Sequence, residues 1–510
     1  MTHPIVLATL NSKYIHASFG LRYLKANLGD LESECALKEF TIQERPVDIV
    51  EQILAEQPKI VGFGVYIWNS TQTEAVIRIL KLVAPEILIV IGGPEVSYEW
   101  EEQSIVEAAD VLIKGEGEVL FREVCEDYLK RGEVSASVFS APVLEVDQLA
   151  SPYRLYSDED LANRVLYVEA SRGCPFKCEY CLSSLDKSVR AFDLDQFLAE
   201  MDQLLARGAT QFKFVDRTFN LKIDTSQRIL SFFLERWKPG IFVHFEMVPD
   251  RLPDQLREVI AQFPEGVLQF EVGIQTFNPE VSKLISRRQN LDRLEDNLNW
   301  LRSTGVHVHA DLIAGLPGES LESFGKGFER LVALGPQEVQ VGILKRLRGT
   351  PISRHTEEFG MVYDSVIPYE ILKTSELSFA DLQDIKRFAR YWDLVGNSGN
   401  FPNTLPLLLG EKPFENFWTF AAWLWETTGQ THKIALKRLF EFLWDYLSER
   451  HSDVDEVGLS LLRDWRGGGR RDMLNPLRPW DEQVDLVEKT RTELPERQSR
   501  HVREESRNSA

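Results

Sequence analysis

Three cysteines stand within eight positions in the stretch SRGCPFKCEYC, residues 171–181. Cys174, Cys178 and Cys181 have the spacing C-x3-C-x2-C, and no fourth cysteine follows them. This spacing is too tight for a disulfide staple, and three ligands are one short of the closed tetrahedral set of a structural zinc site. The chemistry of this stretch therefore depends on what fills the missing ligand position.

Closely spaced thiolates are soft ligands, which select zinc, copper or iron–sulfur clusters. Zinc would need a fourth donor, and His244, His307 and His309, the best candidates, stand far along the chain. A cubane iron–sulfur cluster usually takes four thiolates, so three leave one iron open to an external ligand. The incomplete ligand set is thus the feature that indicates a function.

Composition limits the class of protein. The chain has 510 residues, 43% of them hydrophobic, which suffices for several packed domains. Five cysteines are too few for a secreted disulfide scaffold, so we predict a cytoplasmic protein, with Cys35 and Cys125 as small buried hydrophobic residues. No apolar run has the length of a membrane span, and a net charge of −21 argues against nucleic acid as a partner.

The first part of the chain alternates apolar runs with helical patterns, which predicts an α/β fold with a doubly wound parallel sheet over residues 1–135. Ligands of such sheets bind beyond the carboxyl ends of the strands. Glycines gather at these ends and would let a bulky ligand approach the backbone. The candidate binding residues are Gly92, Gly93, Gly115 and Gly117.

Periodicity weakens over residues 136–164, which we predict to be a linker. Six further apolar runs, each followed by a helical pattern, predict a partial (β/α)6 barrel over residues 165–360. The three cysteines come just after the first of these runs. In parallel barrels the carboxyl ends of the strands carry the chemistry, so the cysteines stand where a catalytic site is expected.

The last part of the chain is predicted to be an α-helical domain over residues 361–481, followed by a disordered tail over 482–510. Aromatic residues at helical spacing in 414–428 and 435–447 predict a packed core, with the wall of a substrate pocket as the alternative. The stretch RDWRGGGRR (463–471) could contact nucleic acid, but a solvated loop is the preferred interpretation.

The cysteine loop, with an aromatic residue before its last cysteine, resembles the signature of the radical S-adenosylmethionine (SAM) superfamily. The resemblance implies that Cys174, Cys178 and Cys181 bind a 4Fe-4S cluster and that SAM chelates the open iron. One electron then cleaves SAM reductively to a 5'-deoxyadenosyl radical. The donor of that electron would be a protein such as flavodoxin or ferredoxin.

Other segments extend the resemblance. FVDRTFN (214–220), EVGIQT (271–276) and DLIAGLPGE (311–319) are similar to SAM-binding segments of this superfamily. The implied SAM contacts are Asp216, Glu271, Gln275 and Gly315. The motifs IGGPEVS and IKGEGE, followed by a linker containing SPY, resemble the cobalamin-binding branch, which implies cobalamin as a further cofactor and a helical C-terminal domain of unassigned function.

The resemblance implies a cobalamin-dependent radical SAM enzyme, most often a methyltransferase, that modifies an unactivated carbon of an unknown small-molecule substrate. A radical SAM rearrangement or oxidation without methylation is one alternative, and a cobalamin carrier or sensor without catalysis is another. Methylthiolating relatives that act on RNA add a second set of three cysteines, which Cys35 and Cys125 cannot supply.

One position bears on the cobalt ligand. Many cobalamin domains ligate the metal through the histidine of a D-x-H-x-x-G loop after the first strand, and this chain has NSKYIHASFG at 11–20. His16 lacks the aspartate two residues before it, and Gly20 comes one position late. A ligating imidazole needs such a partner to fix its tautomer, so we predict cobalamin without a histidine on its lower face.

Overall fold

The computed structural model describes residues 2–485 and residue 500, so most of the tail predicted at 482–510 lies outside the described residues. The chain divides into two compact units, each described by itself. The first consists of Met1–Arg217, Lys345–Ser353 and Asp364–Tyr369, and the second of Thr218–Leu344, Arg354–Tyr363 and Glu370–Ala510. Across residues 2–485, no helix has both the length and the apolarity to cross a membrane.

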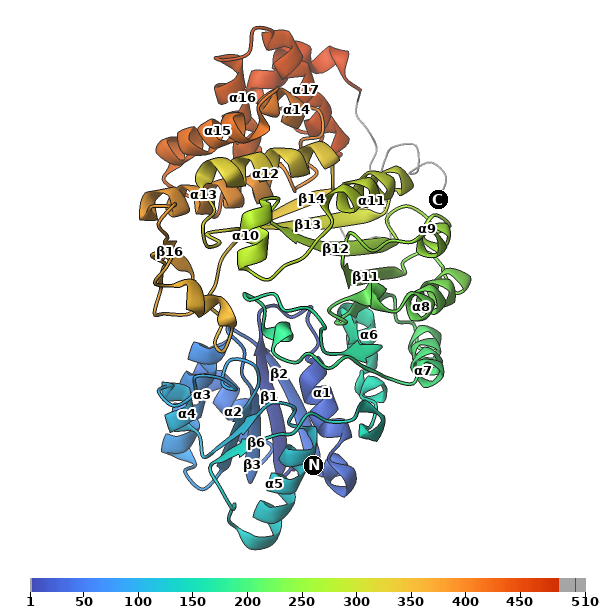
Figure 1. The fold of residues 1–510 in the computed structure, drawn as a ribbon, viewed down its shortest axis with the longest axis vertical. Coiled ribbons are helices and arrows are strands. Elements are labelled where there is room, and N and C mark those ends of the chain that lie inside the picture. The colour runs from blue at the N-terminus through green and yellow to red at the C-terminus, as the bar shows by residue number, and fades with distance from the viewer. Residues whose placement is uncertain (1, 486–499, 501–510) are drawn as a thin grey trace. The chain divides into compact units, whose positions relative to one another are not determined.

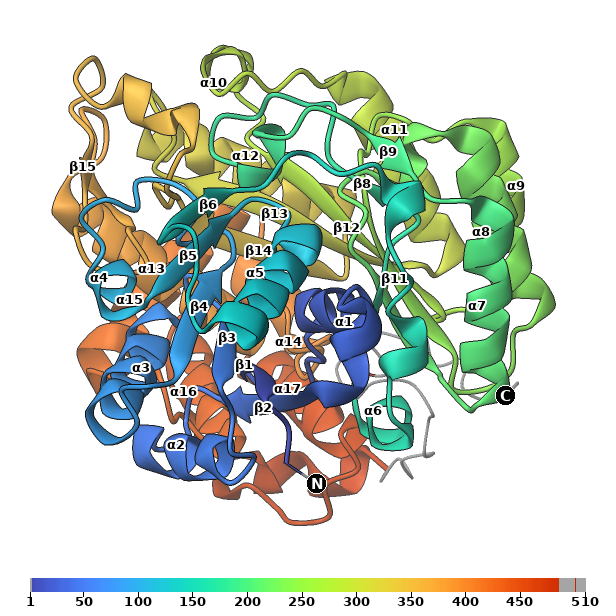
Figure 2. The ribbon, with the colours of Figure 1, turned by 90° about the horizontal axis from the view of Figure 1, so that it is seen from below.

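The first unit contains a parallel sheet of six strands (Figure 1), and their order is β2-β1-β3-β4-β5-β6 (Figure 2). The strands are β1 (Ile5–Asn11), β2 (Cys35–Thr41), β3 (Ile60–Gly64), β4 (Leu88–Gly92), β5 (Val111–Lys114) and β6 (Val138–Ser140). The first five match the apolar runs of the sequence. The sixth pairs in parallel with β5, so the sheet extends beyond the boundary predicted at residue 135.

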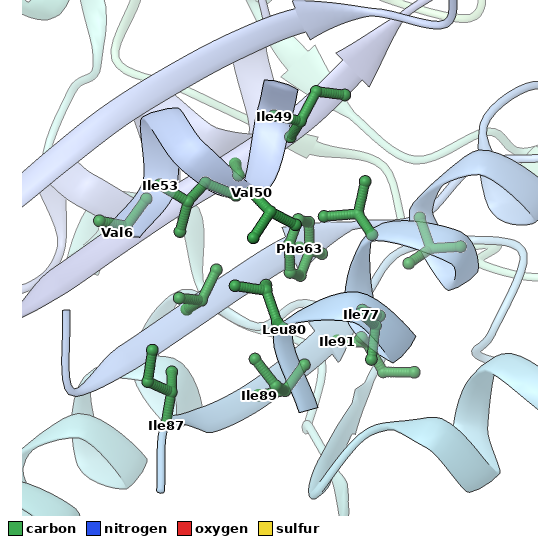
Figure 3. Close-up of a cluster of buried hydrophobic side chains, with 14 of the residues drawn as sticks. Val6, Ile49, Val50, Ile53, Phe63, Ile77, Leu80, Ile87, Ile89 and Ile91 are labelled. Atoms are coloured by element: carbon green, nitrogen blue, oxygen red, sulfur yellow. The ribbon is translucent and has the colours of Figure 1, made fainter. Parts of the chain in front are cut away.

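Helices cover both faces of this sheet, which confirms the doubly wound fold. The helices are α1 (Phe19–Ala26), α2 (Pro46–Leu54), α3 (Ser70–Val83), α4 (Ser104–Ala108) and α5 (Glu118–Arg131). On one face, side chains of α2, α3 and α4 pack against alternate residues of the strands, as Figure 3 shows for Ile53, Leu80 and Ile89. Each fully buried side chain of this kind contributes about 1.5–3 kcal/mol through the hydrophobic effect.

The opposite face carries α1 and α5, and its core includes both cysteines that lie outside the 171–181 stretch. Cys35 is 1% exposed and Cys125 is 0% exposed, which confirms that they are buried hydrophobic residues. Burial raises the pKa of Cys35 to about 12, so this thiol stays protonated at neutral pH. Neither side chain is available as a metal ligand.

The six predicted barrel strands are all present and parallel to their neighbours within each unit. In the first unit β7 (Leu166–Val168) pairs with β10 (Gln211–Phe214). In the second unit the order is β14-β13-β12-β11 (Figure 2). These strands are β11 (Phe242–Met247), β12 (Leu268–Gln275), β13 (His307–Ala314) and β14 (Glu338–Ile343).

Helices follow these strands along the chain, as the sequence pattern predicted. They are α7 (Leu194–Ala206) in the first unit, then α8 (Ile223–Glu235), α9 (Asp254–Ile260), α10 (Pro279–Leu284), α11 (Leu291–Thr304) and α12 (Leu321–Leu334) in the second. The helix α6 (Asp158–Asn163) precedes β7 and lies in the segment predicted to be a linker. Strand β13 shows why the pattern is readable: Val308, Ala310 and Leu312 are at most 2% exposed, whereas His309 and Asp311, which alternate with them, are more accessible.

The second unit continues into five helices, α13 (Phe379–Val395), α14 (Thr404–Leu409), α15 (Pro413–Thr428), α16 (Leu436–Ser448) and α17 (Val454–Gly467). The aromatic stripe of α15 belongs to the core: Phe417 and Phe420 are 0% exposed, and the ring of Phe417 lies 5.0 Å from that of Trp392.

In the 463–471 stretch, the Arg470 guanidinium lies 5.0 Å from the ring of Trp465. This arginine thus packs on its own domain.

Candidate functional site

A cavity of about 320 Å³ opens at the carboxyl ends of the first sheet, within the first unit. All four glycines predicted to bind a ligand there line it, namely Gly92, Gly93, Gly115 and Gly117. Apolar side chains of α1 and α5, among them Leu24 and Phe121, form much of the wall. The structure thus brings together residues that lie 25 positions apart in the sequence, as the strand order of the sheet requires.

Glycine is needed at several of these positions. A Cβ atom on Gly93 would lie 2.4 Å from the carbonyl oxygen of Val65, and Gly93 has a φ of +118°. A Cβ on Gly62, which also lines the cavity, would lie 2.9 Å from side-chain atoms of Leu7 and Phe121. A wall without side chains allows a large ligand to approach the backbone, so the cavity fits part of a cobalamin molecule.

His16 is not among the described residues that line this cavity. Its Nδ1 is 2.8 Å from the hydroxyl of Tyr167, and its backbone forms an isolated parallel bridge with Val165. Burial, together with the charges of Lys213 and Lys13, lowers its pKa, which favours the neutral imidazole. These contacts place the histidine against the start of β7.

The three cysteines lie in a loop that a short antiparallel pair closes, β8 (Ser171–Arg172) with β9 (Arg190–Ala191). Cys174 donates its backbone N–H to the carbonyl of Asp186 at 3.2 Å. Gly173 has a φ of +97°, and a Cβ there would lie 1.8 Å from the carbonyl oxygen of Ser188. Only glycine fits where the loop turns away from the strand.

The structure has all five cysteines as thiols, and in the loop Cys174 and Cys178 are buried whereas Cys181 is partly exposed. Three thiols on one loop are the donor chemistry that an iron–sulfur cluster needs. Within residues 2–485 and residue 500, however, no group of three or more His, Cys, Asp or Glu side chains is placed to hold a metal ion. The assignment of these ligands therefore depends on their spacing.

Asp216 follows β10 and engages the strand that leads into the cysteine loop. Its two carboxylate oxygens accept hydrogen bonds from the Ala170 N–H at 3.0 Å and from the Ser171 hydroxyl at 2.6 Å. The side chain is buried, and burial raises the pKa of Asp216 to about 7. These contacts favour a structural role over the direct SAM contact that the sequence suggested.

We expect Asp216→Asn to flatten the pH dependence of stability. Because the folded pKa of about 7 exceeds the reference value of 3.8, the native state binds this proton more tightly than the unfolded state. The stability from this group is present at low pH and is lost as the pH rises through about 7. Thermal unfolding of both proteins at about pH 5 and about pH 8 should show the smaller shift in the variant.

The matched control is Asp158→Asn, whose side chain is 94% exposed. It should keep the pH dependence of the parent chain. Asp216→Ala, which leaves the Ala170 N–H without its acceptor, should cost about 1–3 kcal/mol in addition. An unchanged pH dependence in Asp216→Asn would show that another group carries it.

The remaining candidate residues lie in the second unit. Glu271 on β12 lies 3.0 Å from Nε2 of His244 on β11. Gln275 ends β12 with a φ of +73°, and its buried Oε1 accepts no hydrogen bond from the described residues. Gly315 follows β13 with a φ of +87°, where a Cβ would lie 2.5 Å from Ile371. An unsatisfied buried oxygen at the end of a strand is available to a ligand that donates a hydrogen bond.

Several charged residues of the first unit did not appear among the candidates from the sequence. Arg172 lines the cavity and stands two residues before Cys174. It pairs with Glu118 and Glu169, each at 2.8 Å, and both glutamates also line the cavity. Burial raises the pKa of Glu169, and the charge of Arg172 opposes this shift. The motifs SRGC and GEGE contain Arg172 and Glu118, and Glu169 stands three residues before Arg172, but none of these stretches shows the pairing.

Two later segments of the first unit, Lys345–Ser353 and Asp364–Tyr369, contact the loop after β4. The Tyr369 hydroxyl donates to Glu95 at 2.7 Å, and Arg348 contacts the same carboxylate at 3.1 Å. The backbone N–H of Ile352 then donates to the carbonyl of Glu179, between the second and third cysteines of the loop, at 3.0 Å. The segment Lys345–Ser353 thus connects the rim of the first sheet with the cysteine loop.

Family models cover most of the chain in three consecutive matches. They are the B12 binding domain at residues 5–125, the Radical SAM superfamily at 168–331 and a protein of unknown function, DUF4080, at 357–465. The first two contain the cavity glycines and the cysteine loop, respectively. The third covers most of the C-terminal helices.

Two of the curated proteins that match illustrate the low identity. An uncharacterized methyltransferase of Pyrococcus horikoshii is 25% identical over 54% of this chain and 64% of its own length. The cobalamin-dependent radical SAM methyltransferase TokK of Streptomyces tokunonensis is 24% identical over 63% of this chain and 51% of its own length. The chain therefore spans about half to two thirds of these relatives.

A solved structure shows the same fold. OxsB, a cobalamin-dependent S-adenosylmethionine radical enzyme with aqua-cobalamin and S-adenosylmethionine bound, aligns with a TM-score of 0.60. The alignment covers 98% of this chain and 83% of that chain at 14% sequence identity. The arrangement of a cobalamin-type sheet followed by a radical SAM barrel and helices is thus shared along nearly the whole chain.

Proposed function

This chain belongs to the cobalamin-binding radical SAM family, and from that premise we propose that it is a cobalamin-dependent radical SAM enzyme that methylates an unactivated carbon of a small molecule. One observation supports this proposal most directly. Within a single compact unit, the glycine cavity and the cysteine loop share a wall residue, Arg172. An enzyme that uses two cofactors on one substrate needs their sites close together.

The residues of the chain would have separate tasks. Cys174, Cys178 and Cys181 would hold a 4Fe-4S cluster, and the glycine-lined cavity would hold cobalamin. When bound, the cluster with SAM supplies one-electron cleavage chemistry and cobalamin supplies methyl-transfer chemistry. The apolar wall formed by residues such as Leu24 and Phe121 would favour an apolar part of a ligand over water.

Residues of the second unit would contribute to the SAM site. The Glu271 carboxylate can accept hydrogen bonds from hydroxyl or amino groups, and Gln275 presents its unsatisfied oxygen at the end of the same strand. Gly315 provides a position without a side chain. An electron donor such as flavodoxin or ferredoxin in the cytoplasm would reduce the cluster. The predicted domain boundaries at residues 164, 360 and 481 belong to the same proposal, and the boundary predicted at 135 moves beyond β6 (Val138–Ser140).

Label transfer would test the reaction. Anaerobically reconstituted protein is incubated with cobalamin, a reductant, candidate metabolites and SAM that carries a deuterated methyl group. Mass spectrometry should detect 5'-deoxyadenosine together with a product that contains the deuterated carbon. Formation of 5'-deoxyadenosine without any labelled product, across substrates that are consumed, would favour rearrangement or oxidation instead.

We also expect that His16 does not ligate cobalt. The residue is not among the described residues that line the cavity, and the stretch around it lacks the aspartate of the D-x-H-x-x-G loop. The EPR spectrum of the cob(II)alamin form should therefore be the same in His16→Ala as in the parent chain. Loss of a nitrogen splitting of the cobalt lines in the variant would show that the histidine is a ligand after all.

A further inference from the structure

The base of the cysteine loop carries two arginines that face each other. In the antiparallel pair of β8 and β9, Arg172 lies directly opposite Arg190. Every residue between them, including the three cysteines, belongs to the loop. Two like charges at directly opposed positions of a strand pair repel each other, so the pair needs carboxylate partners to be stable.

Both arginines find these partners at the rim of the cavity, in the loop after β5 and at the first residue of α5. Arg190 makes two hydrogen bonds to Glu116, at 2.7 and 2.8 Å, and Arg172 makes one to Glu118 at 2.8 Å. The two glutamates alternate with Gly115 and Gly117 along the chain. The residues that leave room for a ligand and the residues that hold the cysteine loop therefore belong to one short segment.

These contacts are largely shielded from water. The side chain of Arg190 is 9% exposed, that of Glu118 is 8% exposed, and those of Arg172 and Glu116 are 18% and 20% exposed. Burial alone would raise the pKa of Glu116, but hydrogen bonds from Arg190 and from the Leu144 N–H lower it. Buried charges in this environment are costly unless they stay paired, so separating the rim from the base of the loop would be unfavourable.

We propose that Arg172, Arg190, Glu116 and Glu118 form a clamp that couples the two cofactor sites, so that a cluster in the cysteine loop strengthens cobalamin binding in the cavity. This inference rests on the proposed function, because it needs both cofactors. The two arginines are positioning residues. They fix the rim segment Gly115–Glu118 against a loop that is itself ordered when its three cysteines share one cluster.

Thermodynamic linkage makes the coupling reciprocal. Suppose that the cluster orders the loop and that the clamp in turn orders the rim. Binding of cobalamin then costs less conformational entropy, so the affinity for cobalamin increases. By the same factor, bound cobalamin favours retention of the cluster. Couplings of this kind usually change affinity by about 5-fold to 150-fold.

The test is a titration of the full chain with hydroxocobalamin, before and after anaerobic reconstitution with iron and sulfide. We expect the reconstituted parent chain to bind at least about 5-fold more tightly than the metal-free chain. In Arg190→Met this ratio should fall to about 1, because the two hydrogen bonds to Glu116 are lost.

Arg154→Met is the matched control. Arg154 makes an ion pair with Glu32 in the same unit, and neither residue lines the cavity among those described. Its ratio should equal that of the parent chain. Circular dichroism shows whether each variant is folded, and its iron content shows whether it carries the cluster. If Arg190→Met does not fold, Arg190→Lys replaces it in the titration, because lysine keeps the charge but not the paired hydrogen bonds.

Each outcome separates the clamp from the proposed function. If the parent chain binds both cofactors but the two affinities are equal, the clamp proposal is wrong and the function stands. The same holds if Arg190→Met or Arg190→Lys keeps the full ratio. If the parent chain binds neither cofactor, both proposals fail.

Discussion

Replacing Cys174, Cys178 and Cys181 together with alanine is expected to abolish iron binding and SAM cleavage. The three thiols are the only cysteines outside the core of the first sheet, since Cys35 and Cys125 are buried there. A cluster held by three thiolates has no replacement donors once they are removed. Anaerobically reconstituted parent protein should contain about four irons per chain, and the triple variant close to none. Chromatography should find 5'-deoxyadenosine only with the parent chain.

The control removes the sulfur atoms of the two cysteines outside the loop. A double variant with Cys35→Ala and Cys125→Ala should keep its iron and form 5'-deoxyadenosine, although loss of two buried sulfur atoms lowers its stability. Iron retained by the triple variant at the level of the parent chain would refute the assignment of the cysteine loop. Loss of iron in the double variant, with the fold intact, would refute it as well.

Filling the glycine cavity is expected to prevent cobalamin binding. Gly117 precedes α5 with a φ of −81°, which any residue adopts, and a Cβ there meets Ile113 and Leu24 at 3.4 and 3.6 Å. Both neighbours line the cavity. Gly117→Ala should therefore fit at ordinary contact distances, whereas the ring of Gly117→Phe would occupy the space of the ligand. We expect at least about tenfold weaker binding of hydroxocobalamin by the phenylalanine variant, a loss of about 1.4 kcal/mol.

The pair of variants separates blocking from unfolding. Both variants should unfold at temperatures close to that of the parent chain, because the new side chain points into a cavity and the backbone conformation at this position suits any residue. Equal affinity of the phenylalanine variant and the parent chain would show that cobalamin does not occupy this cavity. Equal weakening in the alanine variant would point to the rim conformation instead of the lost volume.

Much of the fold could be predicted because alternation along each strand reports which face is buried. The run at 268–275 coincides with β12, and its apolar residues alternate with Gln269, Glu271 and Gly273. Strand β6 was missed because Val138–Ser140 is only three residues long and none of them is buried. Short edge strands carry too little pattern to be recognised.

The candidate site was predictable only where its chemistry is local in sequence. The cysteine spacing and the glycine clusters lie within single stretches, and the structure places all four cavity glycines as expected. The contacts of Asp216 with residues 170 and 171 depend on the pairing of β10 with β7. The facing arginines depend on the register of a pair only two residues long. No pattern in one dimension encodes such contacts.

The discontinuity of the first unit has a consequence for how the protein is made. The hydrogen bond between Arg348 and Glu95 joins residues 253 positions apart, and the strands β11–β14 of the second unit lie between them in sequence. A nascent chain that has emerged only to Arg217 must hold the buried carboxylate of Glu95 without its arginine. Contacts of such long range form late and slowly. The cobalamin-type sheet can therefore fold early during synthesis. The loop after β4, which contains Glu95, reaches its final structure only after Tyr369 has left the ribosome.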